Sequence, residues 1–300
     1  MTLSDLLADA ERQLSAASLS YGHGTTNAHD EAAWLVLWSL GLPLDTDLRS
    51  DSCSKQPLTA AQSARAASVL KARIEQRQPA AYLTREAWLQ GVPFYVDERA
   101  IVPRSLIAEC LADGSIDPWL SAQTHRVLDL CTGNGSLAVL AALAWPGVQV
   151  DASDLSADAL AVARINVERH GLQQRIALIQ GDGLQHCPGP YDLLLCNPPY
   201  VNAASMAALP PEYRAEPALA LAGGTDGMDF IRPLLAAAPA RLSPAGVLVL
   251  EIGHERAHFE AAFPTLDPVW LDTSAGGDQV LLLTRDMLPA CKPPDPHAKR

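Results

Sequence analysis

From residue 126 onward, the chain alternates short apolar segments with segments of helical periodicity. The apolar segments predict strands at residues 127–130, 148–152, 176–179, 192–196, 247–251 and 280–283. Between the second and third of these, Ser156 is placed to cap a helix that ends at Gly171. Alternation of this kind is typical of a parallel sheet with helices on both faces. We therefore predict an α/β protein with a doubly wound sheet.

The first 85 residues show helical rather than strand patterns. Ser4 and Thr59 are placed to cap helices, and a further helix carries Trp34 and Trp38 on its apolar face. Residues 86–103 are aromatic and rich in turn-forming residues, which predicts a hairpin-like connector. The chain is thus expected to consist of a small helical domain at 1–85, the connector at 86–103, a main α/β domain at 104–289 and a disordered, proline-rich tail at 290–300.

The charge of the chain limits its direct partners. The formal net charge is −12, and lysine and arginine form no cluster outside the C-terminal tail. A protein that grips nucleic-acid phosphates needs a basic surface, so direct nucleic-acid binding is disfavoured. A basic protein partner is compatible with the charge, because opposite fields steer encounter. Solubility alone explains the acidity equally well.

The sequence carries no signal for a membrane or for secretion. No run approaches the ~18 uninterrupted apolar residues that a membrane span needs, and the N-terminus has no basic region ahead of an apolar core. The six cysteines form no C-x-x-C pair and no zinc spacing, so no metal site is expected. These features predict reduced cysteines in a cytoplasmic protein.

A glycine-rich loop follows the first predicted strand. Gly133 and Gly135 open the next helix, where glycine lets backbone approach a ligand and leaves helix N–H groups available. Ligands of doubly wound sheets bind outside the carboxyl ends of the strands. The pattern lacks the third glycine of a dinucleotide site, so a tight structural turn explains it equally well.

Acidic residues lie at the ends of the first three predicted strands. Asp154 comes 21 residues after Gly133, where it can accept hydrogen bonds from both ribose hydroxyls or cap the helix near Ser156. Asp182 ends the third strand, at the edge where an adenine ring would lie. A cofactor with a ribose and an adenine but few phosphates suits such a pocket. S-adenosylmethionine fits, because its sulfonium is cationic and its amino group can pair with Asp129 or nearby carbonyls.

The fourth predicted strand runs directly into Asn197-Pro198-Pro199-Tyr200. The Asn197 oxygen can accept one N–H of a planar NH2 group, and the Pro198 carbonyl can accept the other. The prolines hold this corner extended and stiff, and Tyr200 can pack on the planar group. Catalysis by such a site consists mostly of positioning an amide nitrogen against an electrophilic methyl group. The corner therefore predicts a methyltransferase that acts on an amide or amino nitrogen.

No histidine is nominated for catalysis. The nitrogen becomes acidic only as it is alkylated, so no general base is required before transfer. His23 and His29 are isolated and are expected at the surface or as helix caps, and His254 and His258 are expected to be structural.

The order of these motifs resembles that of the HemK-type protein-glutamine N-methyltransferases. The likeness covers most of the chain and rests on Val102-Pro103-Arg104-Ser105, residues 129–135, residues 197–200, Glu212-Tyr213-Arg214-Ala215-Glu216-Pro217 and Gly223-Gly224-Thr225-Asp226-Gly227. The resemblance implies a Rossmann-like class I methyltransferase domain, S-adenosylmethionine as the donor and a protein glutamine as the acceptor. It implies that the acceptor glutamine is held and methylated at Asn197, Pro198, Pro199 and Tyr200. It implies that the cofactor is held by Asp129, Cys131, Thr132, Gly133, Asn134, Gly135, Asp154, Asp182 and Asn197.

Within this family, two stretches look like the branch that modifies the third protein of the large ribosomal subunit. The release-factor branch usually reads Pro-Arg-Pro-x-Thr-Glu, whereas this chain has Pro103-Arg104-Ser105-Leu106-Ile107, and its loop starts with Cys131. Asn134 and Ser136 are mild departures from the ribosomal branch, which often has Ser and Cys there. The helical domain is expected to select the substrate.

Three alternatives stay open at this point. Methylation of release-factor glutamine is separated only by motif likeness. Adenine-N6 methylation of nucleic acid uses a similar corner, and the charge of −12 counts against it. A non-catalytic binding module is disfavoured by the intact Asn197 and Tyr200.

Overall fold

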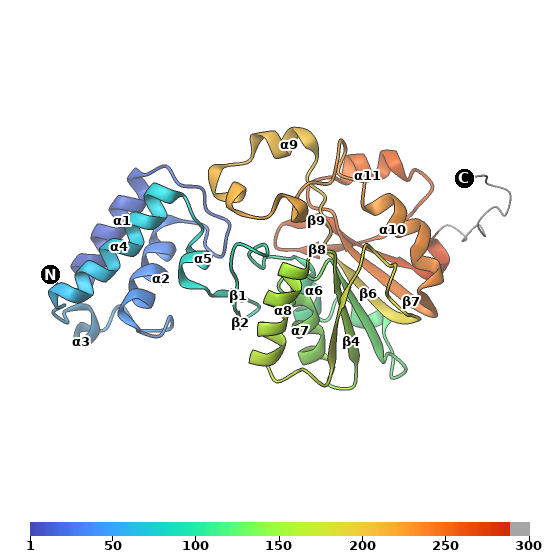
Figure 1. Ribbon diagram of the computed structural model, residues 1–300, viewed down its shortest axis with the longest axis horizontal. Coiled ribbons are helices and arrows are strands. Elements are labelled where there is room, and N and C mark those ends of the chain that lie inside the picture. Colours follow the sequence, from blue (N-terminus) through green and yellow to red (C-terminus); the bar gives the residue numbers. More distant parts are fainter. Residues whose placement is uncertain (289–300) are drawn as a thin grey trace.

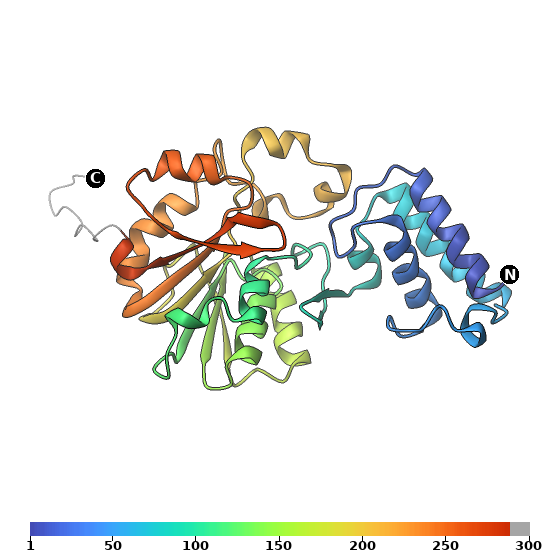
Figure 2. The same cartoon turned by 180° about the vertical axis from the view of Figure 1, so that it is seen from behind.

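The computed structural model describes residues 1–288, so the predicted tail at 290–300 lies outside the described residues. Figures 1 and 2 show a helical N-terminal part and an α/β part side by side, joined through a short hairpin. Within the described part of the chain, no helix is long and apolar enough to cross a membrane.

The N-terminal part is a bundle with its own apolar core. Its buried side chains include Leu3, Leu14, Leu35 and Leu70, drawn from three of its helices. The helices are α1 (Leu3–Ala16), α2 (Ala28–Leu40), α3 (Asp51–Ser54), α4 (Ala60–Gln76) and α5 (Ala80–Thr84).

The cap predicted for the first helix was misplaced by two residues. Thr2, not Ser4, caps α1: its hydroxyl accepts from the Asp5 amide at 3.2 Å, and the Asp5 carboxylate accepts from the Thr2 amide at 2.8 Å. Thr2 has the extended backbone that such a reciprocal cap needs, whereas Ser4 already lies inside the helix. Thr59 caps α4 as predicted.

The remaining elements build the connector and the main domain. The connector contains an antiparallel hairpin of β1 (Ala87–Leu89) and β2 (Val92–Phe94). The main strands are β3 (Arg126–Leu130), β4 (Gln149–Asp154), β5 (Ile176–Gln180), β6 (Tyr191–Cys196), β7 (Leu242–Glu251), β8 (Val269–Thr273) and β9 (Gly276–Thr284). The α-helices are α6 (Ile107–Asp113), α7 (Ser136–Ala144), α8 (Ala157–Arg169), α9 (Ala203–Ala208), α10 (Ile231–Ala237) and α11 (Arg256–Ala262). Short 3-10 turns are η1 (Asp117–Trp119), η2 (Pro211–Ala215), η3 (Ala218–Ala220), η4 (Ala238–Ala240) and η5 (Arg285–Met287).

The seven-stranded sheet has the order β5-β4-β3-β6-β7-β9-β8. The predicted strands are all present, and the chain order reverses between β3 and β6, which pair in parallel with Leu130 opposite Cys196. Two features differ from the prediction: β9 runs antiparallel to β7, and the edge strand β8 was not foreseen. The sheet is therefore mostly parallel, and its switch point lies beside the glycine-rich loop.

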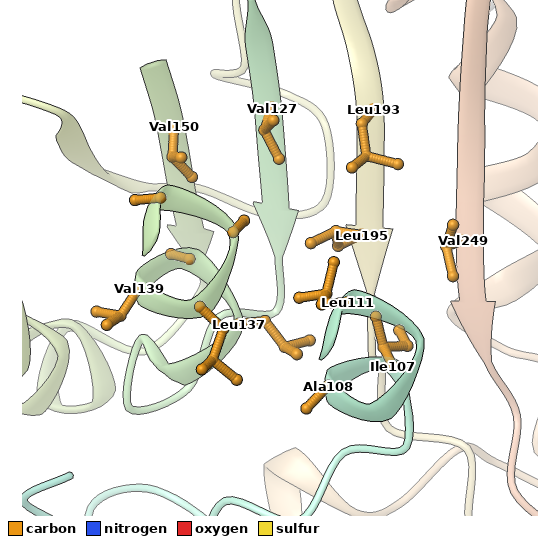
Figure 3. Packing of buried hydrophobic residues seen from close by; sticks show 14 of the residues in the cluster. Ile107, Ala108, Leu111, Val127, Leu137, Val139, Val150, Leu193, Leu195 and Val249 are labelled. Carbon is orange, nitrogen blue, oxygen red and sulfur yellow. The ribbon is translucent and has the colours of Figure 1, made fainter. Parts of the chain in front are cut away.

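Alternate side chains of the strands point into two hydrophobic cores, one on each face of the sheet. On one face, α6 and α7 pack against β3, β4, β6 and β7, as Figure 3 shows for Ile107, Ala108, Leu111, Leu137, Val139, Val127, Val150, Leu193, Leu195 and Val249. On the other face, Ile231 and Leu234 of α10 and Phe259 of α11 meet Leu194 and Leu248. Helices thus cover both faces, as the alternating pattern predicts.

Candidate active site

A cavity lies at the carboxyl ends of the central strands. Among the residues named from the sequence, it is lined by Cys131, Gly133, Asp154, Asp182, Asn197 and Pro199. These residues follow β3, β4, β5 and β6, so the sheet brings together the ends of four strands at its switch point.

Other predicted residues do not line this cavity: Asp129, Thr132, Asn134, Gly135, Pro198 and Tyr200. Conversely, the lining includes residues that the sequence analysis did not name: Arg99, Ala100, Ile101, Leu155, Leu219, Ala220 and Phe230. Residues 100–102 form a run of three apolar residues, and such a run indicates burial but not which part of the protein it covers.

Asp154 ends β4 and holds the loop that follows β3. Its Oδ2 accepts from the Gly133 amide at 2.9 Å, and its Oδ1 accepts from the Ser156 amide at 2.9 Å. Burial raises the pKa of Asp154, and these amide bonds oppose that rise. Ser156 itself caps α8. Each carboxylate oxygen keeps a further lone pair for a ligand hydroxyl. Asp154 can therefore hold the loop and still accept hydrogen bonds from a ligand.

Asp129 is placed behind the loop rather than in the cavity. It is 1% exposed, and its Oδ2 accepts from the Thr132 hydroxyl at 2.5 Å and the Ala138 amide at 2.9 Å. Its Oδ1 has no hydrogen-bond partner within residues 1–288. Burial raises the pKa of Asp129 to about 7. Asp129 therefore ties the loop to the first turn of α7.

Cys131 opens the loop in the left-handed backbone region, with φ of 61°. The neighbouring Cys196 thiol, together with burial, raises the pKa of Cys131. A thiol held protonated in this way is a poor nucleophile. Cys131 therefore contributes shape and not covalent chemistry to the cavity wall.

The Asn197–Tyr200 corner is fixed by backbone contacts with residues far along the chain. The Val201 amide donates to the Leu221 carbonyl, and the Gly223 amide donates to the Val201 carbonyl, both at 2.9 Å. A Cβ on Gly223 would lie 2.7 Å from the Tyr200 backbone, so only glycine permits this approach. The Asn197 side chain is partly exposed, and no hydrogen bond from it to another residue is found in the described chain. Its amide is thus available to a ligand.

Tyr200 points from this corner to a buried carboxylate at the end of β7. Its hydroxyl donates to Glu251 Oε1 at 3.3 Å, while Glu251 Oε2 accepts from the Ser105 hydroxyl at 2.6 Å and the Leu106 amide at 2.9 Å. Burial raises the pKa of both Glu251 and Tyr200. Glu251 therefore joins the corner to residues 105–106, just after the connector.

Two more buried carboxylates, Glu212 in η2 and Glu216 directly after it, pair with residues of the N-terminal half of the chain. Glu216 pairs with Arg104 through both oxygens, at 2.6 and 2.7 Å, and His23 lies 3.6 Å from Glu216. Glu212 pairs with Arg77 at 2.8 Å and with Arg73 at 3.5 Å. These contacts link the bundle and Arg104, at the start of the main domain, to the segment that follows the corner.

His23 is the one histidine whose placement contradicts the prediction. It is 2% exposed, and its ring packs against the Tyr213 ring at a tilt, with ring centroids 4.3 Å apart. An isolated histidine gave no signal for burial, because its neighbours come from residues nearly two hundred positions away. His29 is exposed, as expected, and lies 3.0 Å from Glu11.

Comparisons with known proteins place this geometry in a family. The sequence model described as "Methyltransferase small domain" matches residues 111–209. The chain is 57% identical to a ribosomal protein uL3 glutamine methyltransferase of Bordetella pertussis, with 96% of each chain covered. It is 51% identical to the protein of the same name from Burkholderia pseudomallei, again with 96% of each covered. The solved structure of the hMettl16 catalytic domain with a 3'UTR hairpin shares the fold, with a TM-score of 0.52 at 13% identity over 78% of this chain and 84% of that one.

The mostly parallel sheet, its flanking helices and the matched domain define a Rossmann-like class I methyltransferase, as the sequence pattern predicts. At 49–57% identity over 96% of its length, the chain belongs to the family of ribosomal protein uL3 glutamine methyltransferases.

Proposed function

We propose that the protein transfers a methyl group from S-adenosylmethionine to the side-chain nitrogen of a glutamine in ribosomal protein uL3. The observation that carries this proposal is the convergence of Asp154, Asp182 and Asn197 on one cavity at the switch point of the sheet. The names of the relatives at 57% and 51% identity support the same acceptor.

The chemistry of the cavity fits this cofactor. Asp154 and Asp182 suit hydroxyl and amine donors and a cationic ligand, and they would repel phosphates. Leu155 and Phe230 add apolar surface near Asp182, which suits an adenine ring. The bound cofactor would supply a methyl group on an electrophilic sulfonium. Cys131, Gly133, Asp154 and Asp182 would hold it, with Asp129, Thr132, Asn134 and Gly135 shaping the loop from behind.

Asn197 and Pro198 would orient the acceptor. The Asn197 side-chain oxygen accepts one N–H of the glutamine carboxamide, and the Pro198 carbonyl accepts the other. Fixing the NH2 group in this way directs the nitrogen lone pair toward the cavity, and positioning is worth several orders of magnitude in rate. Because Tyr200 lies outside the cavity lining, packing of its ring on the carboxamide stays a prediction. No residue is assigned as a general base.

The helical bundle at 1–85 and the connector at 86–103 would select the protein substrate. The buried pairs at Glu212 and Glu216 support this assignment, because they fix the bundle relative to the segment that follows the corner. The net charge of −12 suits a basic partner. Modification of a ribosomal protein would place the activity in the cytoplasm.

Neither alternative acceptor is favoured by a specific contact. The hMettl16 likeness, at 13% identity, concerns the fold alone and carries no argument for nucleic acid. Release-factor glutamine remains the second candidate on motif likeness only.

The test is incubation with labelled cofactor and, separately, purified uL3, purified release factor or a ribosome-assembly intermediate. Mass spectrometry then locates the label. We expect one methyl group on a glutamine side chain of uL3. Label on release factor alone, or on nucleic acid in the assembly intermediate, would overturn the proposed acceptor.

A further inference from the structure

One basic side chain faces a cavity whose other charged lining residues are acidic. In the described chain, Arg99 lines the cavity together with Asp154 and Asp182 and is the only lysine or arginine of that lining. It comes from the connector, not from the sheet. Its side chain is 36% exposed, so it is accessible to a ligand. A basic residue in an acidic cavity favours ligand binding only where part of the ligand carries a negative charge.

The Arg99 guanidinium is held in one orientation. Its Nε donates to Asp97 Oδ1 at 2.9 Å, and its Nη2 donates to Asp97 Oδ2 at 2.7 Å. Asp97 is itself fixed by the Tyr95 hydroxyl at 2.8 Å and the Arg99 amide at 3.1 Å. A guanidinium has five N–H donors in a rigid fork, so the pairing with Asp97 leaves donors for a second carboxylate.

Several backbone amides at the start of α7, which could otherwise bind an anion, are already engaged. At the start of α7, the Gly133 amide donates to Asp154 and the Gly135 amide donates to the Thr132 carbonyl. The Ser136 amide donates to the Asn134 side chain, and the Ala138 amide to Asp129. A helix N-terminus of this kind has little capacity left for a ligand carboxylate.

We propose that Arg99 binds the carboxylate of the amino-acid portion of S-adenosylmethionine. This inference rests on the proposed function, because it assumes that cofactor. The carboxylate is the single anionic group of the molecule, and Asp154 and Asp182 disfavour it elsewhere in the cavity. Asp97 acts as a positioning residue that fixes the fork toward the ligand. The connector would thereby bind the amino-acid end of the cofactor, which is opposite its adenine.

The test compares two ligands that differ in this group alone. Dissociation constants of S-adenosylmethionine and decarboxylated S-adenosylmethionine are measured by calorimetry, without acceptor, for wild type and Arg99→Met. Loss of a charge-assisted hydrogen bond lowers affinity by about tenfold or more. The ratio of the two dissociation constants, decarboxylated over intact, is expected to fall about tenfold in Arg99→Met.

Arg85→Met is the matched control. Arg85 lies 3.5 Å from the same Asp97 carboxylate but does not line the cavity, so its loss removes an equal charge without the contact. Its ratio is expected to stay within about twofold of wild type. An equal fall in Arg85→Met, or an unchanged ratio in Arg99→Met, overturns the inference. Failure of wild type to bind either ligand would instead refute the proposed function.

Discussion

At the scale of single residues, the sequence identified the side chains that follow strand ends. Asp154 and Asn197 could be predicted because a parallel sheet puts such positions at one edge, and both line the cavity. Asp129 could not be separated from them by spacing, since only its contacts with Thr132 and Ala138 show that it lies behind the loop. Arg99 could not be predicted as a cavity residue, because no local sequence pattern shows which part of the protein a connector contacts.

Asp154 is expected to serve both the loop and the cofactor. Asp154→Ala removes the acceptor of the Gly133 amide and the carboxylate of the cavity wall. The dissociation constant of S-adenosylhomocysteine should rise at least about tenfold, roughly 1.4 kcal/mol. Calorimetry measures this, and thermal unfolding shows whether the variant is folded. An unchanged dissociation constant in a folded variant would show that the ribose assignment is misplaced.

Gly253 is expected to set the position of the Tyr200 ring. It has φ of +53°, and a Cβ there would lie 2.5 Å from Tyr200 Cε2. Gly253→Ala should therefore displace Tyr200 and lower kcat by about tenfold or more, while cofactor affinity is retained. Gly171→Ala is the control, because Gly171 has φ of +67° but open space around it. Equal loss of activity in both variants would show that backbone strain, and not displacement of Tyr200, lowers kcat.

At the scale of elements, the strands were predictable and the edge of the sheet was not. The central strands are short apolar runs bounded by turn-forming or polar residues, and their length distinguishes them from helices. The edge strand β8 has only Leu271 buried, so its pattern lacks the apolar run of a central strand. The direction of β9 depends on its pairing with β7 and β8, which periodicity does not encode.

The ion pair between Glu216, which follows η2, and Arg104 should make stability depend on pH. Burial raises the pKa of Glu216, but pairing with Arg104 and the proximity of His23 outweigh it and lower the pKa to about 2. A carboxyl whose folded pKa is lowered stabilises the fold above its unfolded value of 4.5. This stabilisation, on the order of 3 kcal/mol, is lost as pH falls from 4.5 toward 2.

Glu216→Gln should remove that dependence. The variant leaves Arg104 unpaired, so its free energy of unfolding at pH 7 should be lower by about 3 kcal/mol or more. Its further decrease between pH 5 and 3 should be smaller than that of wild type. Urea unfolding across this range measures both quantities. Parallel declines in the two proteins would contradict the assigned pairing.

At the scale of the whole molecule, the cavity is closed by parts of the chain that are distant in sequence. Its wall joins connector residues 99–101 to Pro217, Leu219 and Ala220 and to the strand ends. The pairs at Glu212 and Glu216 likewise bridge more than a hundred residues. Composition and periodicity describe local structure, so they gave no signal for contacts between residues this far apart.

The central claim is that the corner at Asn197 holds the acceptor amide and not the cofactor alone. Methyl transfer to uL3 and the dissociation constant of S-adenosylhomocysteine are measured for wild type and Asn197→Ala. Asn202→Ala is the control, because Asn202 lies in the same segment but outside the cavity lining. We predict that Asn197→Ala abolishes transfer while cofactor affinity stays within about tenfold of wild type. Unimpaired turnover in that variant would contradict the account.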